Sequence, residues 1–552
     1  MYSMLPLILA LFAALSWTTV VNAGAPVVTL EYGVFEGAFD GNLSTFRGVP
    51  FAKPAVRFSL PQAPAKLYGL QNATAFSPAC PQQALPPSAP FPVPEMSEDC
   101  LKINVFAPRS AGPHSNLPVL VWIYGGAFEF GDSPDTDVRP VVERSMAIGQ
   151  PIIVVTPNYR VSAWGFLGGK EVGNAGITNL GLRDQIFALE WVQKHIAAFG
   201  GDPARVIIGG PSAGGISAAL LLLDNKRFNP TTLFHGAFLL SGSPLTTTSV
   251  AEAQPDYDGL VAATNCTGAL DTLDCLRRVP FDAFKAAVDQ TPNALSYSSL
   301  NLVWRPRVDG DVVVQDPLIS VSKGLYAKVP IMTGDDDDEG TLFSLSSTNI
   351  TTNEEFVGYV HSNFFPKATP AEIAKLAVLY PDDPTQGSPF DTGLANQVTP
   401  QFKRIAAFQG DMYFTGARRF FLEHASKTQN TWSWLSKQGK STPTLGASHT
   451  SDITTWFPAT ISNFTGGFVP VDALVNFINT LDPNHSATGS RSRPSGIVWP
   501  KWNAPSSDGH GSLLTLSDPG VVNITLENFR VDAMRFLYGL ALREAEQRAG
   551  AY

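Results

Sequence analysis

A five-residue turn, Gly210-Pro211-Ser212-Ala213-Gly214, directly follows the apolar run 206–208 and constrains this chain more than any other feature. A strand that ends in Gly-x-Ser-x-Gly and continues as a helix holds a serine hydroxyl at the tip of a sharp bend. Glycine is needed on both sides because a Cβ there would crowd the neighbouring strand and helix. The apolar stretch 216–223 supplies the expected helix. The pattern predicts Ser212 as a nucleophile; the alternative is a glycine-rich turn without chemistry.

Strand-like and helix-like segments alternate along the chain, which is typical of an α/β fold with a largely parallel central sheet flanked by helices. Continuous apolar runs at 118–124 and 151–156 predict strands that are buried on both faces. Apolar residues at three- and four-residue steps between 181 and 198 predict an amphipathic helix. No linker, repeat or low-complexity run divides the chain. We therefore expect residues 24–552 to form one large domain with Ser212 at the carboxyl edge of a central strand.

Export from the cell is expected from three features. Residues 1–23 contain a short apolar segment and a small-residue cleavage site at Val21-Asn22-Ala23, as in a signal peptide; the alternative is a buried N-terminal segment. Four cysteines fall into two neighbouring pairs, and local pairing of Cys80 with Cys100 and of Cys266 with Cys275 is the simplest of three connectivities. Seven candidate glycosylation sequons occur, at Asn42, Asn72, Asn265, Asn349, Asn463, Asn484 and Asn523.

Composition excludes several classes of partner. The net charge is −10 with no basic cluster, so nucleic-acid binding has no electrostatic support. The polar end 543–552 argues against a C-terminal lipid or membrane anchor, and we expect no stable membrane insertion. No metal-ligand spacing occurs among the cysteines, and we expect neither a metal nor an organic cofactor. A hydrophobic fraction of 44% with 35 phenylalanines favours a deep core and an apolar substrate channel.

A second glycine-rich turn, 125–128, follows the predicted strand 118–124. Small residues let backbone N–H groups approach a developing oxyanion, so Gly126 and Ala127 are candidate donors. The amide of Ala213, immediately after the nucleophile, is the natural third donor. The alternative is a turn that serves packing only.

These segments match a known family in combination. Residues 97–101, 124–128, 158–160 and 199–203, with the Ser212 turn, resemble the type-B carboxylesterase/lipase family, which includes the cholinesterases. Residues 380–404 are particularly similar to the fungal lipases and sterol esterases of the Candida rugosa type. The resemblance runs from about Gly33 to the C-terminus and implies an α/β-hydrolase fold and ester hydrolysis through an acyl-enzyme.

The resemblance also assigns the remaining catalytic partners. Asp338-Glu339-Gly340 matches the family's acid motif, and Gly446-Ala447-Ser448-His449 matches its histidine motif. His449 is then expected to take the Ser212 proton, and Glu339 to orient the imidazole. On charge pattern alone, the five acids 335–339 would instead be a solvated loop or a calcium site.

By motif position, several apolar residues resemble the lining of the family's acyl tunnel. Trp304 and Tyr297 add aromatic surface that could accommodate an aryl acid, so aryl and feruloyl esters are candidate substrates. The alternative for the pocket residues is ordinary core packing. The expected pocket residues are Leu300, Leu302, Trp304, Leu342, Phe343 and Phe414.

The chain departs from the family pattern at three places. Pro211 stands where most members carry glutamate, and Ala127 replaces a glycine of the oxyanion loop. The loop from Cys80 to Cys100 holds only 19 residues, six of them proline, and such a stretch cannot form the amphipathic flap of the lipases. We expect a short rigid lid loop and weak interfacial activation.

These observations favour a secreted carboxylesterase, with aryl or feruloyl esters among its candidate substrates. The alternative within the enzyme class is a triacylglycerol lipase or sterol esterase of broad specificity. A more distant alternative is a non-catalytic binding protein on the same fold. The substrate is a small-molecule or lipid ester, and the chain is expected to be a monomer or a homodimer.

Overall fold

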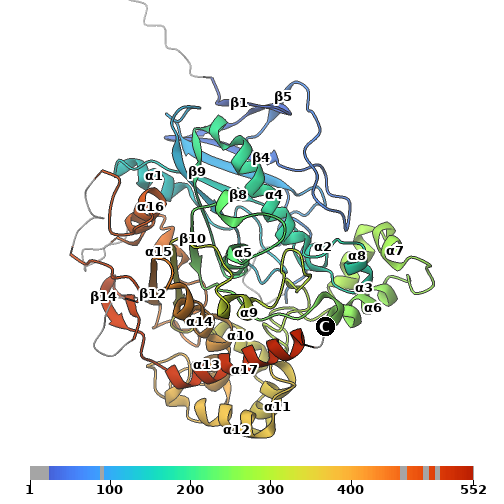
Figure 1. Cartoon of the computed structure of the whole chain (residues 1–552), viewed down its shortest axis with the longest axis vertical. Coiled ribbons are helices and arrows are strands. Elements are labelled where there is room, and N and C mark those ends of the chain that lie inside the picture. The colour runs from blue at the N-terminus through green and yellow to red at the C-terminus, as the bar shows by residue number, and fades with distance from the viewer. Residues whose placement is uncertain (1–23, 87–92, 461–468, 489–495, 504–509, 551–552) are drawn as a thin grey trace, which may run out of the picture.

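The computed structural model of the protein describes residues 24–86, 93–460, 469–488, 496–503 and 510–550 (Figure 1). The predicted signal segment 1–23 and the middle of the proline-rich loop, 87–92, lie outside these residues.

A large mixed sheet forms the centre of the described structure. Its eleven strands follow the order β14-β13-β12-β11-β10-β9-β7-β8-β6-β4-β3. The strands from β13 to β8 in this order are parallel, while β14 at one edge and β6, β4 and β3 at the other are antiparallel. The strands are β3 (Ala38–Asp40), β4 (Leu43–Pro50), β6 (Lys102–Pro108), β7 (Leu117–Trp122), β8 (Ile153–Pro157), β9 (Gly201–Pro211), β10 (Gly236–Leu240), β11 (Ile331–Asp336), β12 (Thr431–Lys437), β13 (Ser512–Ser517) and β14 (Val521–Leu526).

A smaller sheet lies near the start of the described chain (Figure 1). It pairs β1 (Val27–Leu30) with β2 (Gly33–Glu36) in antiparallel fashion and β2 with β5 (Leu70–Asn72) in parallel.

Strand β7 is apolar along its whole length because both faces of the sheet are covered there. In β7, Val119 and Val121 pack into one core cluster, whereas Leu120 and Trp122 pack into a second cluster on the opposite face. The alternation of side chains along a strand sends successive residues to opposite faces, so both sets of β7 side chains pack in a core.

Helices cover both faces of the central sheet. The first core includes residues of α2 (Ser162–Phe166), α4 (Leu180–His195) and α5 (Ala213–Leu222), and the second includes residues of α1 (Arg139–Ala147), α15 (Ile453–Trp456) and α16 (Pro470–Thr480). The remaining α-helices are α3 (Lys170–Asn174), α6 (Gln254–Ala263), α7 (Thr272–Arg278), α8 (Phe281–Val288), α9 (Pro317–Ser322), α10 (Thr341–Ser344), α11 (Asn353–Asn363), α12 (Pro370–Leu379), α13 (Phe402–Gly410), α14 (Gly416–Ala425) and α17 (Val531–Ala549). No helix in these ranges combines the length and apolar character needed to cross a bilayer.

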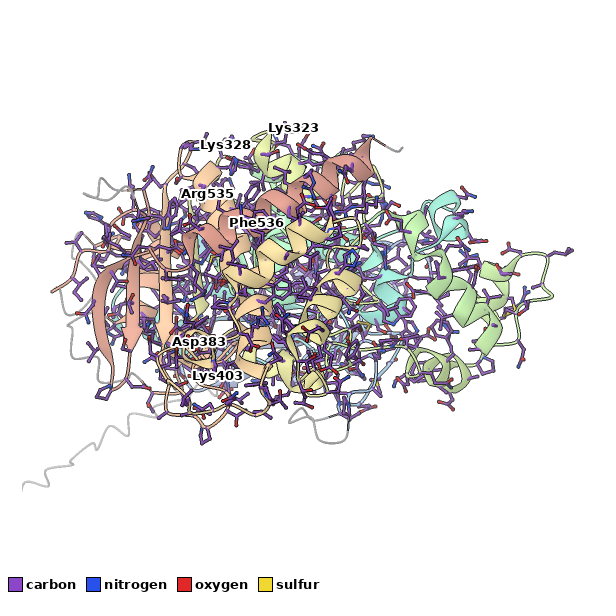
Figure 2. The ribbon with its side chains drawn as sticks, turned by 90° about the horizontal axis from the view of Figure 1, so that it is seen from below. Lys323, Lys328, Asp383, Lys403, Arg535 and Phe536 are labelled. Atoms are coloured by element: carbon purple, nitrogen blue, oxygen red, sulfur yellow. A yellow bond between two sulfur atoms is a disulfide. The ribbon has the colours of Figure 1, made fainter. Side chains whose placement is uncertain are left out.

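A third core cluster joins the C-terminal helix α17 to α11, α12 and α13. Ile373 and Leu376 of α12 pack in this cluster with Leu537 and Leu540 of α17. At the surface, the Lys375 ammonium lies 4.4 Å from the centre of the Phe536 ring. Figure 2 shows Phe536 and its neighbour Arg535 on α17.

The α/β-hydrolase architecture predicted from the sequence is confirmed, with shifts at element ends. The expected strands 118–124 and 151–156 occupy 117–122 and 153–157. The expected helix 181–198 is α4, which ends at His195 and passes into a 3-10 turn, Ile196–Phe199. These ends shift because capping and packing, which apolar periodicity does not report, decide where an element stops.

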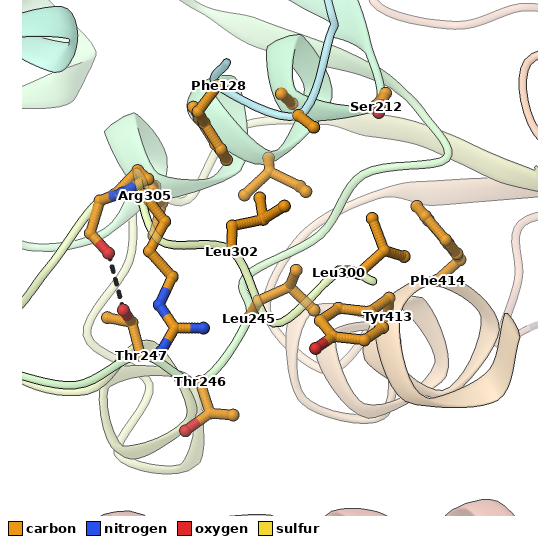
Figure 3. A pocket seen from close by; sticks show the side chains of 15 residues that line it. Phe128, Ser212, Leu245, Thr246, Thr247, Leu300, Leu302, Arg305, Tyr413 and Phe414 are labelled. Atoms are coloured by element: carbon orange, nitrogen blue, oxygen red, sulfur yellow. Dashed lines mark hydrogen bonds between the residues drawn. The ribbon is translucent and has the colours of Figure 1, made fainter. Parts of the chain in front are cut away.

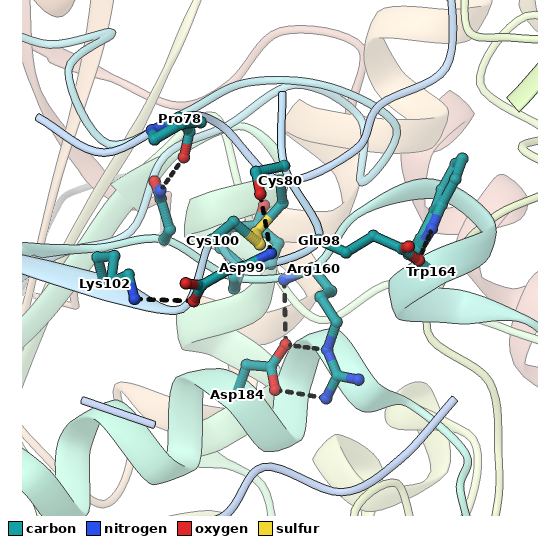
Figure 4. Close-up of a disulfide and its surroundings, with 12 residues drawn as sticks. Pro78, Cys80, Glu98, Asp99, Cys100, Lys102, Arg160, Trp164 and Asp184 are labelled. Atoms are coloured by element: carbon teal, nitrogen blue, oxygen red, sulfur yellow. Dashed lines mark hydrogen bonds and ion pairs between the residues drawn. A yellow bond between two sulfur atoms is a disulfide. The ribbon is translucent and has the colours of Figure 1, made fainter. Parts of the chain in front are cut away.

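Both expected disulfides are present, Cys80–Cys100 and Cys266–Cys275. The Cys80–Cys100 disulfide lies beside polar contacts of segments 97–101 and 158–160, two of the segments that resemble the family (Figure 4). Arg160 grips Asp184 with two hydrogen bonds of 2.7 Å, and Glu98 accepts from the Trp164 indole at 2.9 Å. These two segments of the family pattern are therefore scaffold and contribute no group to the cavities described below.

The sequons differ in accessibility. Five of their asparagines are exposed: Asn42, Asn72, Asn265, Asn349 and Asn523. Asn463 lies outside the described residues. Asn484 corrects the expectation: its side chain is buried and exchanges hydrogen bonds with the backbone of Trp499 at 2.7 and 3.0 Å. An amide nitrogen held in this way is not available to a glycan.

A buried charge network lies beside β11. Arg418 of α14 pairs with Asp335 at 2.6 Å and with Glu527 at 2.7 Å, and all three side chains are fully buried. Removing one member of such a network leaves buried charges without a partner.

We predict that Arg418→Met lowers the free energy of unfolding by about 3–5 kcal/mol, because buried Asp335 loses its cation and Glu527 keeps only Arg419, at 3.4 Å. Arg278→Met, which removes an exposed ion pair with Asp274, is the matched control and should cost less than about 1 kcal/mol. Urea unfolding curves measure both; equal midpoint shifts would contradict the prediction.

Candidate active site

Ser212 occupies a sharp turn between β9 and α5. Its backbone has φ 53° and ψ −126°, a conformation that non-glycine residues adopt only where the surrounding structure enforces it. A Cβ on Gly210 would lie 2.1 Å from the carbonyl oxygen of Ile123, and one on Gly214 would lie 2.0 Å from the same atom. The two glycines of the pentapeptide are therefore required sterically, because the end of β7 presses against both sides of the turn.

Glu339 and His449 form a hydrogen-bonded pair. Glu339 Oε2 lies 2.5 Å from His449 Nδ1. The other carboxylate oxygen, Oε1, accepts from Ser241 Oγ at 2.6 Å and from the Asp336 amide at 2.8 Å. Three interactions hold the carboxylate in one orientation, and the carboxylate in turn orients the imidazole.

The second ring nitrogen of His449 is available for chemistry. Nε2 is buried and has no hydrogen-bond partner among the described residues. His449 and Ser212 line the same cavity. An unengaged base nitrogen in the cavity that contains the serine hydroxyl is the arrangement that proton abstraction requires.

Asp338 joins the loops that carry Glu339 and His449. Its carboxylate accepts from Lys440 at 2.7 and 2.8 Å and from the Ala447 amide at 2.8 Å. The Asp338 amide donates to the carbonyl oxygen of Ala447 at 2.9 Å. A Cβ on Gly446 would lie 2.3 Å from Asp338 Oδ2, so the motif glycine permits this contact.

The acidic run 335–339 is not a solvated loop. All five side chains are at most 7% exposed. Burial, reinforced by Asp452 and Glu339, holds the pKa of Asp336 well above its usual range, and burial raises the pKa of Asp452 to about 7. In the described ranges, no group of three or more acidic, histidine or cysteine side chains is arranged to hold a metal ion.

The candidate oxyanion loop follows β7 and turns tightly. Gly126 has φ 102° and Ala127 φ 55°, and the Gly126 carbonyl accepts from the amides of Glu129 and Phe130 at 2.9 and 3.0 Å. A Cβ on Gly126 would lie 2.1 Å from the Phe130 carbonyl oxygen. Within the described structure, the amides of Gly126, Ala127 and Ala213 donate no hydrogen bond, which leaves all three free for a substrate oxygen.

Glu129 anchors this loop from inside the protein. Its Oε2 accepts from the Ala294 amide at 2.8 Å, whereas Oε1 is buried without a partner among the described residues. Burial raises the pKa of Glu129 to about 8. At neutral pH the side chain is therefore mostly a neutral acid that joins the oxyanion loop to the segment at 294.

Two cavities meet at Ser212 and Ala127. One is narrow, with a volume of about 60 Å³, and the other is wide, about 570 Å³. The expected pocket residues divide between them: the narrow cavity is lined by Leu300, Leu302 and Phe414, and the wide one by Leu342 and Phe343.

Trp304 corrects the pocket expectation. It is 1% exposed, packs in the main core cluster and donates from its indole to Thr291 at 3.1 Å. Neither Trp304 nor Tyr297 lines either cavity. The aromatic surface expected beside the acyl group is supplied instead by Tyr413 and Phe414, which lie in a π-helical turn, Asp411–Thr415, between α13 and α14.

Sequence reasoning missed three residues of this site: Ser241 behind Glu339, Glu129 under the oxyanion loop, and Arg305 in the narrow cavity. Glu129 carried a weak signal, an acidic residue directly beside the glycine turn 125–128. Ser241 and Arg305 carried no sequence signal, because the groups they lie against, Glu339 and the Ser212 cavity, belong to segments about a hundred residues away.

We predict that Ser241→Ala lowers kcat about 10- to 100-fold and changes KM less than about twofold, because Glu339 loses one of its charged hydrogen bonds. Ser243→Ala is the matched control: this nearby hydroxyl is buried but has no hydrogen-bond partner among the described residues. Steady-state kinetics on one soluble ester would decide, and unchanged kcat in Ser241→Ala would refute the role of this contact.

We predict that Glu129→Gln changes the pH dependence of stability. A carboxyl whose pKa is 4.5 when unfolded and about 8 when folded loses stabilising protonation as pH rises through this window. The glutamine variant does not titrate, so its stability relative to wild type should rise by roughly 2–4 kcal/mol between pH 5 and 8. Urea unfolding at both pH values tests this, with exposed Glu423→Gln as control; parallel wild-type and variant profiles would argue against it.

Comparison with known proteins agrees with this geometry. Residues 24–532 match the Carboxylesterase family. The chain is 39% identical to Lipase 4 of Diutina rugosa over 534 residues, covering 92% of this chain and 95% of the lipase. It is 36% identical to the secreted triacylglycerol lipase LIP1 of Gibberella zeae over 543 residues, covering 94% and 90%.

A solved structure shows the same fold. The crystal structure of Aspergillus niger EstA superimposes with a TM-score of 0.81 at 27% identity, covering 94% of this chain and 99% of EstA. The sequence match over most of the chain, the shared fold and the Ser212 turn lead to one conclusion: the protein is a member of the carboxylesterase family of carboxylic-ester hydrolases.

Proposed function

We propose that this protein is a secreted serine ester hydrolase in which Ser212, His449 and Glu339 form the catalytic triad. The observation that carries the proposal is the Glu339–His449 pair, whose free Nε2 lies in the cavity that contains Ser212. The non-catalytic alternative has little support, because nucleophile, base, acid and oxyanion donors are all retained. The Gibberella zeae relative is named a secreted lipase, which supports secretion.

The reaction follows from these positions. Ser212 Oγ attacks the ester carbonyl carbon while His449 Nε2 accepts its proton. The amides of Gly126, Ala127 and Ala213 stabilise the oxyanion, and the carbon–oxygen ester bond then breaks as His449 returns the proton to the leaving alcohol. Water, activated by His449, hydrolyses the acyl-enzyme and releases the carboxylic acid. Glu339 orients the ring and stabilises the imidazolium without taking the proton itself.

The two cavities support separate binding of the acyl and alcohol parts of the ester. The narrow cavity, whose walls are mainly apolar, suits the acyl chain, and the wide cavity on the His449 side suits the alcohol. A wide alcohol side accommodates simple alcohols, aryl alcohols and glycerol alike, so the geometry supports broad alcohol tolerance.

Triacylglycerol hydrolysis is the second candidate. The names of the Diutina rugosa and Gibberella zeae relatives favour it, and they weigh at least as much as the preference for a simple carboxylesterase drawn from the short lid loop. The described parts of that loop, 81–86 and 93–99, contain no helix, and 87–92 lie outside the described residues. Weak interfacial activation remains a prediction.

We predict that Ser212→Ala lowers kcat for p-nitrophenyl butyrate at least about 10³-fold, because the acyl-enzyme cannot form. Wild-type rates on p-nitrophenyl butyrate, tributyrin, triolein and methyl ferulate, measured under one set of conditions, then rank the candidates. Rapid triolein hydrolysis identifies a lipase, and activity confined to short or feruloyl esters identifies a carboxylesterase. Full activity in Ser212→Ala would remove the basis of the mechanism.

A further inference from the structure

The narrow cavity that begins at Ser212 ends in polar groups. Close to the serine its walls are apolar, with Leu300 and Leu302 among them, but its far end is lined by Arg305, Thr246 and Tyr413. Figure 3 shows Arg305 and Thr246 across the cavity from Ser212, with the Tyr413 hydroxyl directed away from the serine. A pocket for a plain hydrocarbon chain has no need of a guanidinium at its end, because burying a cation against apolar groups is costly.

The Arg305 guanidinium is largely unused by the protein. Nη1 donates to Asn301 Oδ1 at 2.8 Å, and Nε is buried without a partner among the described residues. No carboxylate of the described structure forms an ion pair with Arg305. By contrast, Arg144, Arg160 and Arg530 each donate two or more hydrogen bonds to a carboxylate. Arg305 is therefore a cation at a cavity wall without the anion that such a group normally has.

The surrounding charges do not neutralise Arg305 by contact. Asp256 and Glu252 attract it from beyond ion-pair distance, while Arg548 and Arg307 oppose them. Asp316, the carboxylate that contacts Thr246 of the cavity wall, is engaged: it accepts from Thr246 Oγ1 at 2.7 Å and pairs with Arg548 at 3.4 Å. Burial lowers the pKa of Arg305, as expected for a guanidinium removed from water.

A second donor lies beside it. The Tyr413 hydroxyl forms no hydrogen bond with the described residues, and its ring lies at the wall of the same cavity. The Arg305 charge acts on this hydroxyl and partly opposes the rise in the Tyr413 pKa that burial causes. Thr246 Oγ1, by contrast, already donates to Asp316 and accepts from Arg548 at 2.8 Å. The unused hydrogen-bonding groups at the end of the cavity are thus a guanidinium and a phenol, both able to donate.

We propose that the narrow cavity binds acyl groups whose far end carries a carboxylate, so that monoesters of dicarboxylic acids are substrates and Arg305 and Tyr413 determine this specificity. The inference rests on the proposed function, because it assigns the acyl chain to this cavity. A carboxylate supplies the missing anion and accepts from several guanidinium N–H groups at once, which a hydroxyl cannot do to the same extent. Substrate binding would bring the partly buried cation its partner.

The test compares acyl tails of equal length. p-Nitrophenyl monoesters of the dicarboxylic acids from adipic to sebacic acid are compared at pH 7 with p-nitrophenyl alkanoates of matching chain length. The quantity measured is the ratio of kcat/KM for the carboxylate-ended ester to that for the methyl-ended ester. Because both values come from the same preparation, a partial loss of folded protein cancels in the ratio.

At the best chain length, we predict that Arg305→Leu lowers this ratio at least about tenfold, because the charged hydrogen bonds to the tail are lost. Arg305→Lys should retain part of it, and Tyr413→Phe should lower it by a smaller factor. Arg535→Leu, an exposed arginine on α17, is the matched control and should leave the ratio unchanged. Inhibition of the wild type requires no variant: the free dicarboxylate should inhibit at least about tenfold more strongly than the monocarboxylate of equal length.

Three outcomes would overturn the inference: an unchanged ratio in Arg305→Leu at every length, equal inhibition by the two acids, or an equal advantage for ω-hydroxyacyl esters, which would assign the site to neutral groups. Each of these leaves the proposed function intact as long as the alkanoates are hydrolysed. Failure of the wild type to hydrolyse any ester in the series would instead refute the proposed function itself.

Discussion

The contact between the end of β7 and the Ser212 turn is the constraint on which the rest of the site depends. The carbonyl oxygen of Ile123 lies where a Cβ on either Gly210 or Gly214 would collide with it. The proposed oxyanion loop is the direct continuation of β7, so this contact places the proposed oxyanion donors beside Ser212. The Ser212 amide donates to the Leu240 carbonyl at 2.8 Å, which fixes the turn against β10 as well.

Further contacts connect β10 to His449, the proposed base. Ser241 follows Leu240 directly and donates to Glu339, which holds His449. Asp338 then ties the acid and histidine loops together through the Ala447 backbone. Each group of the proposed triad is thereby positioned by its neighbour, and β9, β10 and β11 act as one frame because they are adjacent in the sheet.

The acids around this frame show how burial changes their chemistry. Five consecutive acidic residues would carry strong mutual repulsion if all were ionised and close together. Asp335 is paired with Arg418, Asp338 with Lys440, and the pKa of Asp336 is raised by burial. The Glu339–His449 hydrogen bond therefore lies in surroundings where Asp335 and Asp338 are paired with cations and the pKa of Asp336 is raised. The unpaired cation Arg305, on the other side of Ser212, stands out against this pattern.

The local rules of the chain determined the fold class, the strand–turn–helix at Ser212, the oxyanion turn and both disulfides, because glycine spacing, apolar runs and near-neighbour cysteines act over short distances. The proposed roles of Glu339 and His449 came from the family resemblance of their motifs, since the hydrogen bond between them spans 110 residues and no periodicity encodes it. Only the tertiary structure decided that Trp304 packs in the core, that Asn484 is engaged, that the acidic run is buried and that Arg305 lacks an anion. Burial and partnership are properties of the space between distant segments, and a residue's identity does not specify what will lie opposite it.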